Sequence, residues 1–201
     1  GQAMTMIQAV ASTGRITLCR VPWNDPVWIM KFLDAGATGI VCPMVNNRAE
    51  AEAFVSACRY SPEGNRSWGP VRIPFDNPPE YKDWANKNIA TLAMIETQEA
   101  FDNLDEILTT PGLDAIYVGP SDLAIGLGES PDGMARAPKV IAAIDAIYAA
   151  AGKHDVIPCI HTGSGGMAKE YLAKGWRLTT IQNDMRLMLA GAADALKAAR
   201  S

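Results

Sequence analysis

Hydrophobic and polar positions along the chain repeat one pattern: a short apolar run, a turn rich in Gly, Pro, Asn or Asp, and an amphipathic stretch. Apolar runs bounded by such turns are typical of buried strands, and apolar positions three or four residues apart are typical of helices. The pattern therefore predicts alternating strands and helices. The six predicted strands are Ile16–Arg20, Gly39–Pro43, Ile89–Ile95, Ala115–Val118, Val156–His161 and Arg177–Ile181.

The amphipathic stretches predict the helices of this alternation. Asp25 is a predicted N-cap, and Pro26 suits the first helical position after it. Residues 60–88 and 126–138 break the rhythm, because Gly and Pro argue against a long regular element there. A loop of such length is usually functional. The predicted helices are Ala3–Ala11, Pro26–Asp34, Arg48–Cys58, Gln98–Leu108, Lys139–Ala151, Gly166–Ala173 and Met185–Ala199.

Strands that alternate with helices predict an α/β fold with a parallel sheet. No G-x-G-x-x-G turn is present, which favours a (β/α)₈ TIM barrel over a doubly wound sheet. We predict one barrel domain over residues 1–201, with about six of the eight strands in this chain. Because such barrels need about 250 residues, we expect roughly 50 further N-terminal residues that hold two strands.

Composition and charge narrow the class of protein. The chain is 48% hydrophobic and 20% charged, and no apolar run approaches the roughly 18 residues that cross a bilayer. The net charge of −4 and the absence of a Lys/Arg block argue against nucleic acid as a partner. The four cysteines show no C-x-x-C spacing. We therefore expect reduced thiols in a cytoplasmic protein without a membrane span.

Two carboxylates follow successive predicted strands. Glu96 ends one strand and Asp122 follows the next, and neighbouring parallel strands lie about 4.8 Å apart. Both side chains can therefore reach one point, where two carboxylates suit Mg²⁺ or Mn²⁺. The alternative is that each acid lies in the first turn of the following helix and interacts with its dipole.

Other polar residues stand at the same strand ends. The turn from Gly119 to Asp122 offers N–H groups to an anion, although Ser121 could be an ordinary N-cap. Arg20 could stabilise an enolate or form a surface ion pair. His161 precedes a glycine-rich loop of a kind that binds phosphate in such barrels. Asn46, Asn47 and Asp184 also follow strands, and Trp23 and Trp68 fall in loops where an aromatic ring could shape a pocket.

Five segments together resemble the HpcH/HpaI family of metal-dependent class II 2-oxo-acid aldolases, and the resemblance covers nearly the whole chain. Each segment is moderately specific alone, and their shared order makes the resemblance strong. They are Arg20–Asp25, Val41–Asn47, Arg59–Pro70, Met94–Thr97 and Val118–Leu123.

The resemblance implies a role for each matching residue. Glu96 and Asp122 would bind the metal, which we expect to be Mg²⁺ or Mn²⁺, or alternatively Co²⁺. The N–H groups of Ser121 and Asp122 would hold the substrate carboxylate, Arg20 would stabilise the enolate oxygen, and Trp23 would contact substrate. The implied reaction is reversible cleavage of a 4-hydroxy-2-oxo acid to pyruvate, or an analogue, and an aldehyde. The family also implies a homo-oligomer, a trimer or hexamer that exchanges its C-terminal helices.

Two positions depart from the family pattern. Met94 stands where family members often have Gln, and the histidine base of the family belongs to a region that would precede Gly1. We expect that base in the further N-terminal residues, since His161 lies on a different strand. The alternatives are a catalytically impaired barrel remnant and a related acyl-CoA lyase, although no CoA-binding extension is evident.

Overall fold

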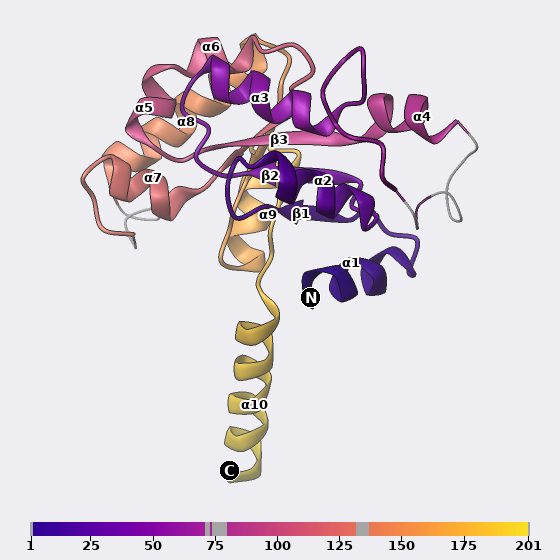
Figure 1. Ribbon diagram of the computed structural model, residues 1–201. Helices are drawn as coiled ribbons and strands as arrows, with labels where there is room; N and C mark the ends of the chain where they lie inside the picture. The colour runs from indigo at the N-terminus through magenta and orange to yellow at the C-terminus, as the bar shows by residue number, and fades with distance from the viewer. Residues whose placement is uncertain (1, 71–72, 74–79, 132–136, 201) are drawn as a thin grey trace.

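The computed structural model describes residues 2–70, 73, 80–131 and 137–200 (Figure 1). Its six strands are all parallel and lie in sequence order in one sheet that curls like part of a barrel. The predicted count of six parallel strands is confirmed. The strands are β1 (Leu18–Arg20), β2 (Gly39–Cys42), β3 (Ala90–Ile95), β4 (Ala115–Val118), β5 (Ile157–Ile160) and β6 (Leu178–Thr179).

Helices follow the strands and cover the outside of the sheet. Asp25 accepts a hydrogen bond from the Val27 N–H at 2.7 Å, and Pro26 begins the second helix, as predicted. The helices are α1 (Gln2–Ala11), α2 (Pro26–Asp34), α3 (Arg48–Cys58), α4 (Tyr81–Asn88), α5 (Gln98–Asp102), α6 (Leu104–Leu108), α7 (Pro120–Gly126), α8 (Pro138–Lys153), α9 (Gly165–Ala173) and α10 (Asp184–Arg200).

Three helical segments differ from the prediction. Helix α4 lies inside the stretch expected to be irregular, because it begins only after the last proline; Pro74, Pro78 and Pro79 themselves lie outside the described residues. The helix expected over Gln98–Leu108 is divided into α5 and α6 at Asn103, whose side chain donates to the Asn46 carbonyl at 2.9 Å. The turn at Gly119 leads directly into α7, a helix that the alternative for Asp122 implied but whose bounds were not predicted.

The sheet buries apolar side chains on both faces. One set packs under the helices and includes Ile40, Ile95 and Val118. Alternate positions of the same strands form a second cluster on the inner face of the curl. This inner cluster consists of Val41, Leu92, Met94, Ala115, Tyr117 and Cys159. Any polar residue that continues the inner alternation past a strand end therefore lies at the mouth of the curl.

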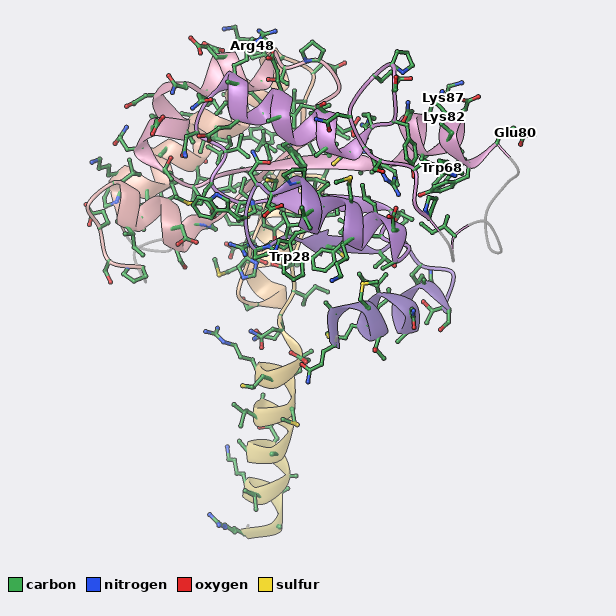
Figure 2. All side chains as sticks on the ribbon, viewed as in Figure 1. Trp28, Arg48, Trp68, Glu80, Lys82 and Lys87 are labelled. Carbon is green, nitrogen blue, oxygen red and sulfur yellow. The ribbon has the colours of Figure 1, made fainter. Side chains whose placement is uncertain are left out.

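The segment Arg59–Pro70 stabilises the fold instead of lining the strand ends. The Arg59 guanidinium donates to the Ile89 carbonyl at 2.9 Å, and the Arg66 guanidinium donates to Asp34 at 2.7 Å while it lies over the ring of Tyr60. Trp68 packs against Tyr60 and Tyr81, close to α4 (Figure 2). Trp68 therefore contributes to an aromatic cluster outside the strand ends.

Helix α10 projects away from the remainder of the molecule (Figure 1). None of its 17 residues is buried, although it carries Met185, Leu187, Met188, Leu189 and Leu196. No helix in the described ranges is long and apolar enough to cross a membrane. All four cysteines are free thiols.

Candidate active site

The register of the sheet places four residues in one row across the mouth of the curl. Ile95, Val118, Ile160 and Thr179 are direct neighbours on β3, β4, β5 and β6. The residue after each of them is one step beyond its strand end and points to the inner face. The row is Glu96, Gly119, His161 and Thr180. Three polar residues from three strand ends thus share this face, with a glycine between the first two.

A cavity of about 440 Å³ opens at this row. Its charged lining comes from Arg20 at the end of β1 and from Asp122 in the first turn of α7. A hollow of about 510 Å³ lies elsewhere, lined by α1, α2 and the segment after α3 instead of strand ends. The cavity at the strand ends is lined by Leu18, Arg20, Val41, Met94, Tyr117, Gly119, Pro120, Ser121, Asp122, His161, Leu178 and Thr180.

Glu96 is buried with half of its carboxylate unsatisfied. The residue is 1% exposed, and its Oε1 accepts a hydrogen bond from the Met44 N–H at 2.8 Å. Its Oε2 has no hydrogen-bond partner in the described part of the chain. A buried carboxylate oxygen without a partner costs free energy that a bound cation or donor would offset.

The groups around Glu96 shift the pKa of its carboxyl in opposite directions. Burial raises the pKa of the Glu96 carboxyl above its usual range, and the nearby charge of Asp122 raises it further. The Met44 N–H and the positive charge of Arg20 lower it. Two carboxylates therefore lie close enough to repel each other, which is the arrangement that a divalent cation relieves.

Gly119 makes room for this carboxylate. A Cβ atom at this position would lie 2.5 Å from Glu96 Oε2 and 3.0 Å from Met94 Cε. Its φ of −97° is accessible to any residue, so the local backbone does not require glycine. The requirement is the space itself, because Oε2 of the buried Glu96 occupies the notch that a side chain at this position would fill.

The structure decides between several alternatives for the acidic residues and Ser121. Thr97, and not Glu96, caps α5, so Glu96 lies outside that helix. Asp122 does lie in the first turn of α7 and also lines the cavity, so its two interpretations are compatible. The N-cap of α7 is Gly119 without a side-chain cap, so Ser121 as an ordinary N-cap is wrong. Ser121 lies in the first turn, on the cavity wall.

Arg20 and Trp23 differ in where the structure places them. Arg20 lines the cavity, and its positive charge lowers the pKa of both Glu96 and Tyr117. Trp23 lies in the loop after β1 with 58% of its surface exposed, and the residues that line the cavity do not include it. Its contact with substrate stays a prediction.

Tyr117, His161 and Thr180 line the side of the cavity opposite Glu96. The sequence alone singles out neither Tyr117 nor Thr180, and it assigns no role to His161. His161 Nδ1 lies 3.2 Å from the Tyr117 hydroxyl and 3.1 Å from Thr180 Oγ1. Burial and the charge of Arg186 lower the pKa of His161, and burial raises the pKa of Tyr117. The period-two alternation with Gly119 places Tyr117 on the inner face, but it does not indicate the contact with His161.

The asparagines and Asp184 at other strand ends have local structural roles. Asn46 accepts a hydrogen bond from Thr97 Oγ1 at 2.6 Å, and Asn47 caps α3 through the Glu50 N–H. Asp184 begins α10 and accepts a hydrogen bond from the Met185 N–H. These residues support neighbouring loops and helices, and they do not line the cavity.

The residues at the mouth fit a hard divalent cation. Glu96 supplies a buried, unpartnered oxygen, and the charge of Asp122 acts on it electrostatically. The described residues contain no cluster of three or more His, Cys, Asp or Glu side chains for a metal. Two protein carboxylates with other oxygen donors are the ligand set typical of Mg²⁺ rather than of structural zinc.

Comparison with known proteins identifies the family. The family model for the HpcH/HpaI aldolase/citrate lyase domain matches residues 1–189. The chain belongs to this family. Family membership, predicted from five segments of the sequence, is thereby confirmed.

Two curated relatives carry aldolase names. The chain is 42% identical over 204 residues to a hydroxypyruvate/pyruvate aldolase of Rhizorhabdus wittichii, covering 100% of this chain and 80% of the relative. It is 37% identical over 195 residues to a 4-hydroxy-2-oxo-heptane-1,7-dioate aldolase of Salmonella dublin, covering 94% and 72%. A crystal structure of a family member from Burkholderia cenocepacia superposes with a TM-score of 0.90 at 29% identity, covering 99% and 80%.

Proposed function

We propose that the chain is a class II aldolase that reversibly cleaves 4-hydroxy-2-oxo acids to pyruvate, or a close analogue, and an aldehyde. The observation that carries this proposal is the buried, unpartnered Oε2 of Glu96, which lies in the notch left by Gly119. Glu96 itself is not among the residues that line the cavity, but Asp122 and Arg20 line it and both act electrostatically on Glu96. The aldolase names of the two curated relatives support the same reaction class.

Glu96 and Asp122 are the proposed ligands of a divalent cation, with Mg²⁺ and Mn²⁺ the expected ions and Co²⁺ a possible substitute. When bound, the ion supplies Lewis-acid stabilisation of negative charge on the oxygens of a 2-oxo acid. Met44 holds Glu96 in place through its N–H. The N–H groups of Ser121 and Asp122, in the first turn of α7, are the proposed donors to the substrate carboxylate.

Arg20 is the proposed donor to the oxygen that gains charge as the carbon–carbon bond breaks. Its guanidinium is always charged, and its position at the end of β1 places that charge at the cavity. The cavity wall between Arg20 and the carboxylates is formed by Val41 and Met94. These apolar side chains limit water around the reacting oxygens and thereby strengthen the electrostatic interactions there.

Metal removal tests the proposal directly. Chelation should abolish pyruvate release by the full-length protein, and Mg²⁺, Mn²⁺ or Co²⁺ should restore it. Manganese binding, followed by electron paramagnetic resonance, should be lost in Glu96→Gln and kept in Asp105→Asn, a control at an exposed carboxylate on α6. Activity that survives exhaustive chelation would contradict the proposal, as would a Schiff base trapped by borohydride with pyruvate.

The sheet and α10 support two further proposals about assembly. We propose that the parallel sheet is part of an eight-stranded barrel, because its inner face already buries a second apolar cluster. We also propose that α10 packs on another copy of this chain in a homo-oligomer, a trimer or hexamer with exchanged C-terminal helices. The support is its projection from the body with five large apolar side chains at least 55% exposed.

Solution mass tests the packing of α10. Leu189→Asp, at a residue 61% exposed, should dissociate the oligomer because a charge then enters the apolar contact. Lys197→Ala, on the same helix, is the control and should leave the oligomer intact. Light scattering after size exclusion gives the mass. A wild-type protein that is monomeric at micromolar concentration would contradict helix exchange.

A further inference from the structure

Three uncharged side chains form the wall of the cavity that lies across Gly119 from Glu96. Tyr117 belongs to the inner row one step below the mouth, and His161 and Thr180 belong to the mouth row itself. Because Gly119 has no side chain, no group of the mouth row separates Glu96 from His161. A substrate held at the carboxylates would extend across this glycine toward the imidazole.

Hydrogen bonds fix the orientation of His161. Its Nδ1 lies within hydrogen-bond distance of both the Tyr117 hydroxyl and Thr180 Oγ1. Thr180 is held in turn, since its Oγ1 accepts from the Thr162 N–H at 2.9 Å and lies 3.1 Å from the Thr162 carbonyl. Nδ1 therefore lies between two hydroxyls, and that of Thr180 is itself held in place.

The second ring nitrogen of His161 is available to a ligand. The described residues offer no hydrogen-bond partner to Nε2, and the residue lines the cavity. Nδ1 either accepts from a hydroxyl or donates to one, so Nε2 is either a donor or an acceptor. A hydroxyl group pairs with both forms, because it can donate and accept. The lowered pKa of His161 favours the neutral ring and so disfavours an anion as ligand.

We propose that His161, oriented by Tyr117 and Thr180, is a specificity-determining residue that binds a hydroxyl substituent of the substrate. This inference rests on the proposed aldolase function and assigns no proton transfer to the imidazole. The hydroxyl belongs either to carbon 3 of the 2-oxo acid or to the carbon next to the aldehyde. In both cases an unhydroxylated substrate offers Nε2 no partner of its own and gains nothing from His161.

Four substrate pairs separate these two sources. Pyruvate and 3-hydroxypyruvate are each combined with acetaldehyde and with glycolaldehyde, and kcat/KM is measured for the full-length, metal-loaded protein. His161→Ala should lower kcat/KM about tenfold for pairs that contain the recognised hydroxyl and change the other pairs less than about twofold. A loss confined to the pairs that contain 3-hydroxypyruvate identifies the hydroxyl on the 2-oxo acid as the one recognised. A loss confined to the pairs that contain glycolaldehyde identifies the hydroxyl on the aldehyde.

Two variants serve as controls. His161→Gln keeps a terminal amide that can donate or accept, and it should recover part of the selectivity. His154→Ala changes the other histidine, which pairs with Asp105 at the surface, and it should leave all four pairs unchanged. Equal loss for all four pairs, or no loss for any pair, would overturn the inference.

A binding measurement separates this inference from the proposed function. Isothermal titration gives the dissociation constants of pyruvate and 3-hydroxypyruvate, and of glycolaldehyde with pyruvate present, for the wild type and His161→Ala. Selective weakening of one hydroxylated compound, in a protein that cleaves none of the four aldol products, would support the hydroxyl site while contradicting the aldolase proposal. Normal cleavage, with selectivity and binding unchanged in His161→Ala, would support the aldolase proposal and contradict the hydroxyl site.

Discussion

The two sides of the cavity are built on the same row of strand ends but differ in how completely their polar groups are satisfied. On one side, Glu96 is buried with an unpartnered oxygen, and its charge is opposed by that of Asp122. On the other side, Tyr117, His161 and Thr180 bond to one another and carry no formal charge when the imidazole is neutral. The first side is incomplete without a cation, whereas the second is stable by itself.

This difference separates the residues needed for turnover from the residues that set substrate preference. An unsatisfied buried carboxylate reduces the stability of the metal-free fold, so a function must maintain it. A side-chain network whose hydrogen bonds are satisfied except at one nitrogen costs little stability. Its residues can therefore be replaced to suit a different substrate without loss of stability. We therefore expect substitutions on the carboxylate side to abolish turnover and substitutions on the imidazole side to alter preference.

The largest effect is expected for Glu96→Gln. Turnover should fall to background, and added Mg²⁺ should no longer raise the melting temperature, because the metal ligand is lost. The melting temperature of the metal-free variant should be no lower than that of the wild type. The reason is that Gln keeps the acceptor for the Met44 N–H and removes a buried charge.

The sign of the pH dependence follows from the raised pKa of Glu96. The folded protein binds a proton at this carboxyl more tightly than the unfolded chain does, so the ionised group lowers the free energy of unfolding at neutral pH. This cost should disappear as the pH falls through the raised pKa. Thermal melts against pH should show this dependence in the metal-free wild type and not in Glu96→Gln.

The next largest effect is expected for Gly119→Ala, which fills the space between the two sides. The added Cβ would lie 2.5 Å from Glu96 Oε2, so the carboxylate must move. Metal affinity and kcat/KM should both fall, the latter by about 10²-fold, a loss typical of misplaced catalytic groups. Gly152→Ala is the matched control, since a Cβ there meets nothing within 4 Å. Normal metal affinity in Gly119→Ala would show that the notch is not required.

Much of the fold and of the carboxylate side followed from local sequence patterns. Apolar runs bounded by turns located all six strands, and Glu96 and Asp122 were placed near each other because they follow neighbouring strands. This reasoning works because parallel strands end at one edge of the sheet. The role of Ser121 as an N-cap was wrong because the glycine before Pro120 occupies that position.

The imidazole side was not predictable in the same way. Tyr117 lies inside an apolar run and has the pattern of a core residue, and its hydroxyl acquires a role only when β5 places His161 beside it. Thr180 follows a strand of two residues, which is too short for a clear alternation. These contacts depend on the register between strands, which a single sequence does not specify.

An intermediate effect is expected for Arg20. Arg20→Ala should lower kcat about 10²-fold, as loss of one oxyanion donor commonly does, while thermal stability stays unchanged. Arg20→Lys should recover part of the rate, because charge is kept but the forked geometry is lost. Arg48→Ala is the control, since Arg48 pairs with Glu52 on the surface of α3 (Figure 2). Turnover near the wild-type value in Arg20→Ala would make Arg20 a surface charge only.

The smallest effect is expected for Trp23, which stands just beyond Arg20 in the loop after β1. The ring is 58% exposed and is not among the residues that line the cavity. If it covers bound substrate, Trp23→Ala should raise KM roughly three- to tenfold, about 1 kcal/mol of binding, with kcat unchanged. Trp28→Ala, at a ring 42% exposed on α2 that packs on Phe32, is the matched control (Figure 2). Equal constants for the two variants would remove Trp23 from the substrate site and confine the carboxylate side to Arg20, Glu96 and Asp122.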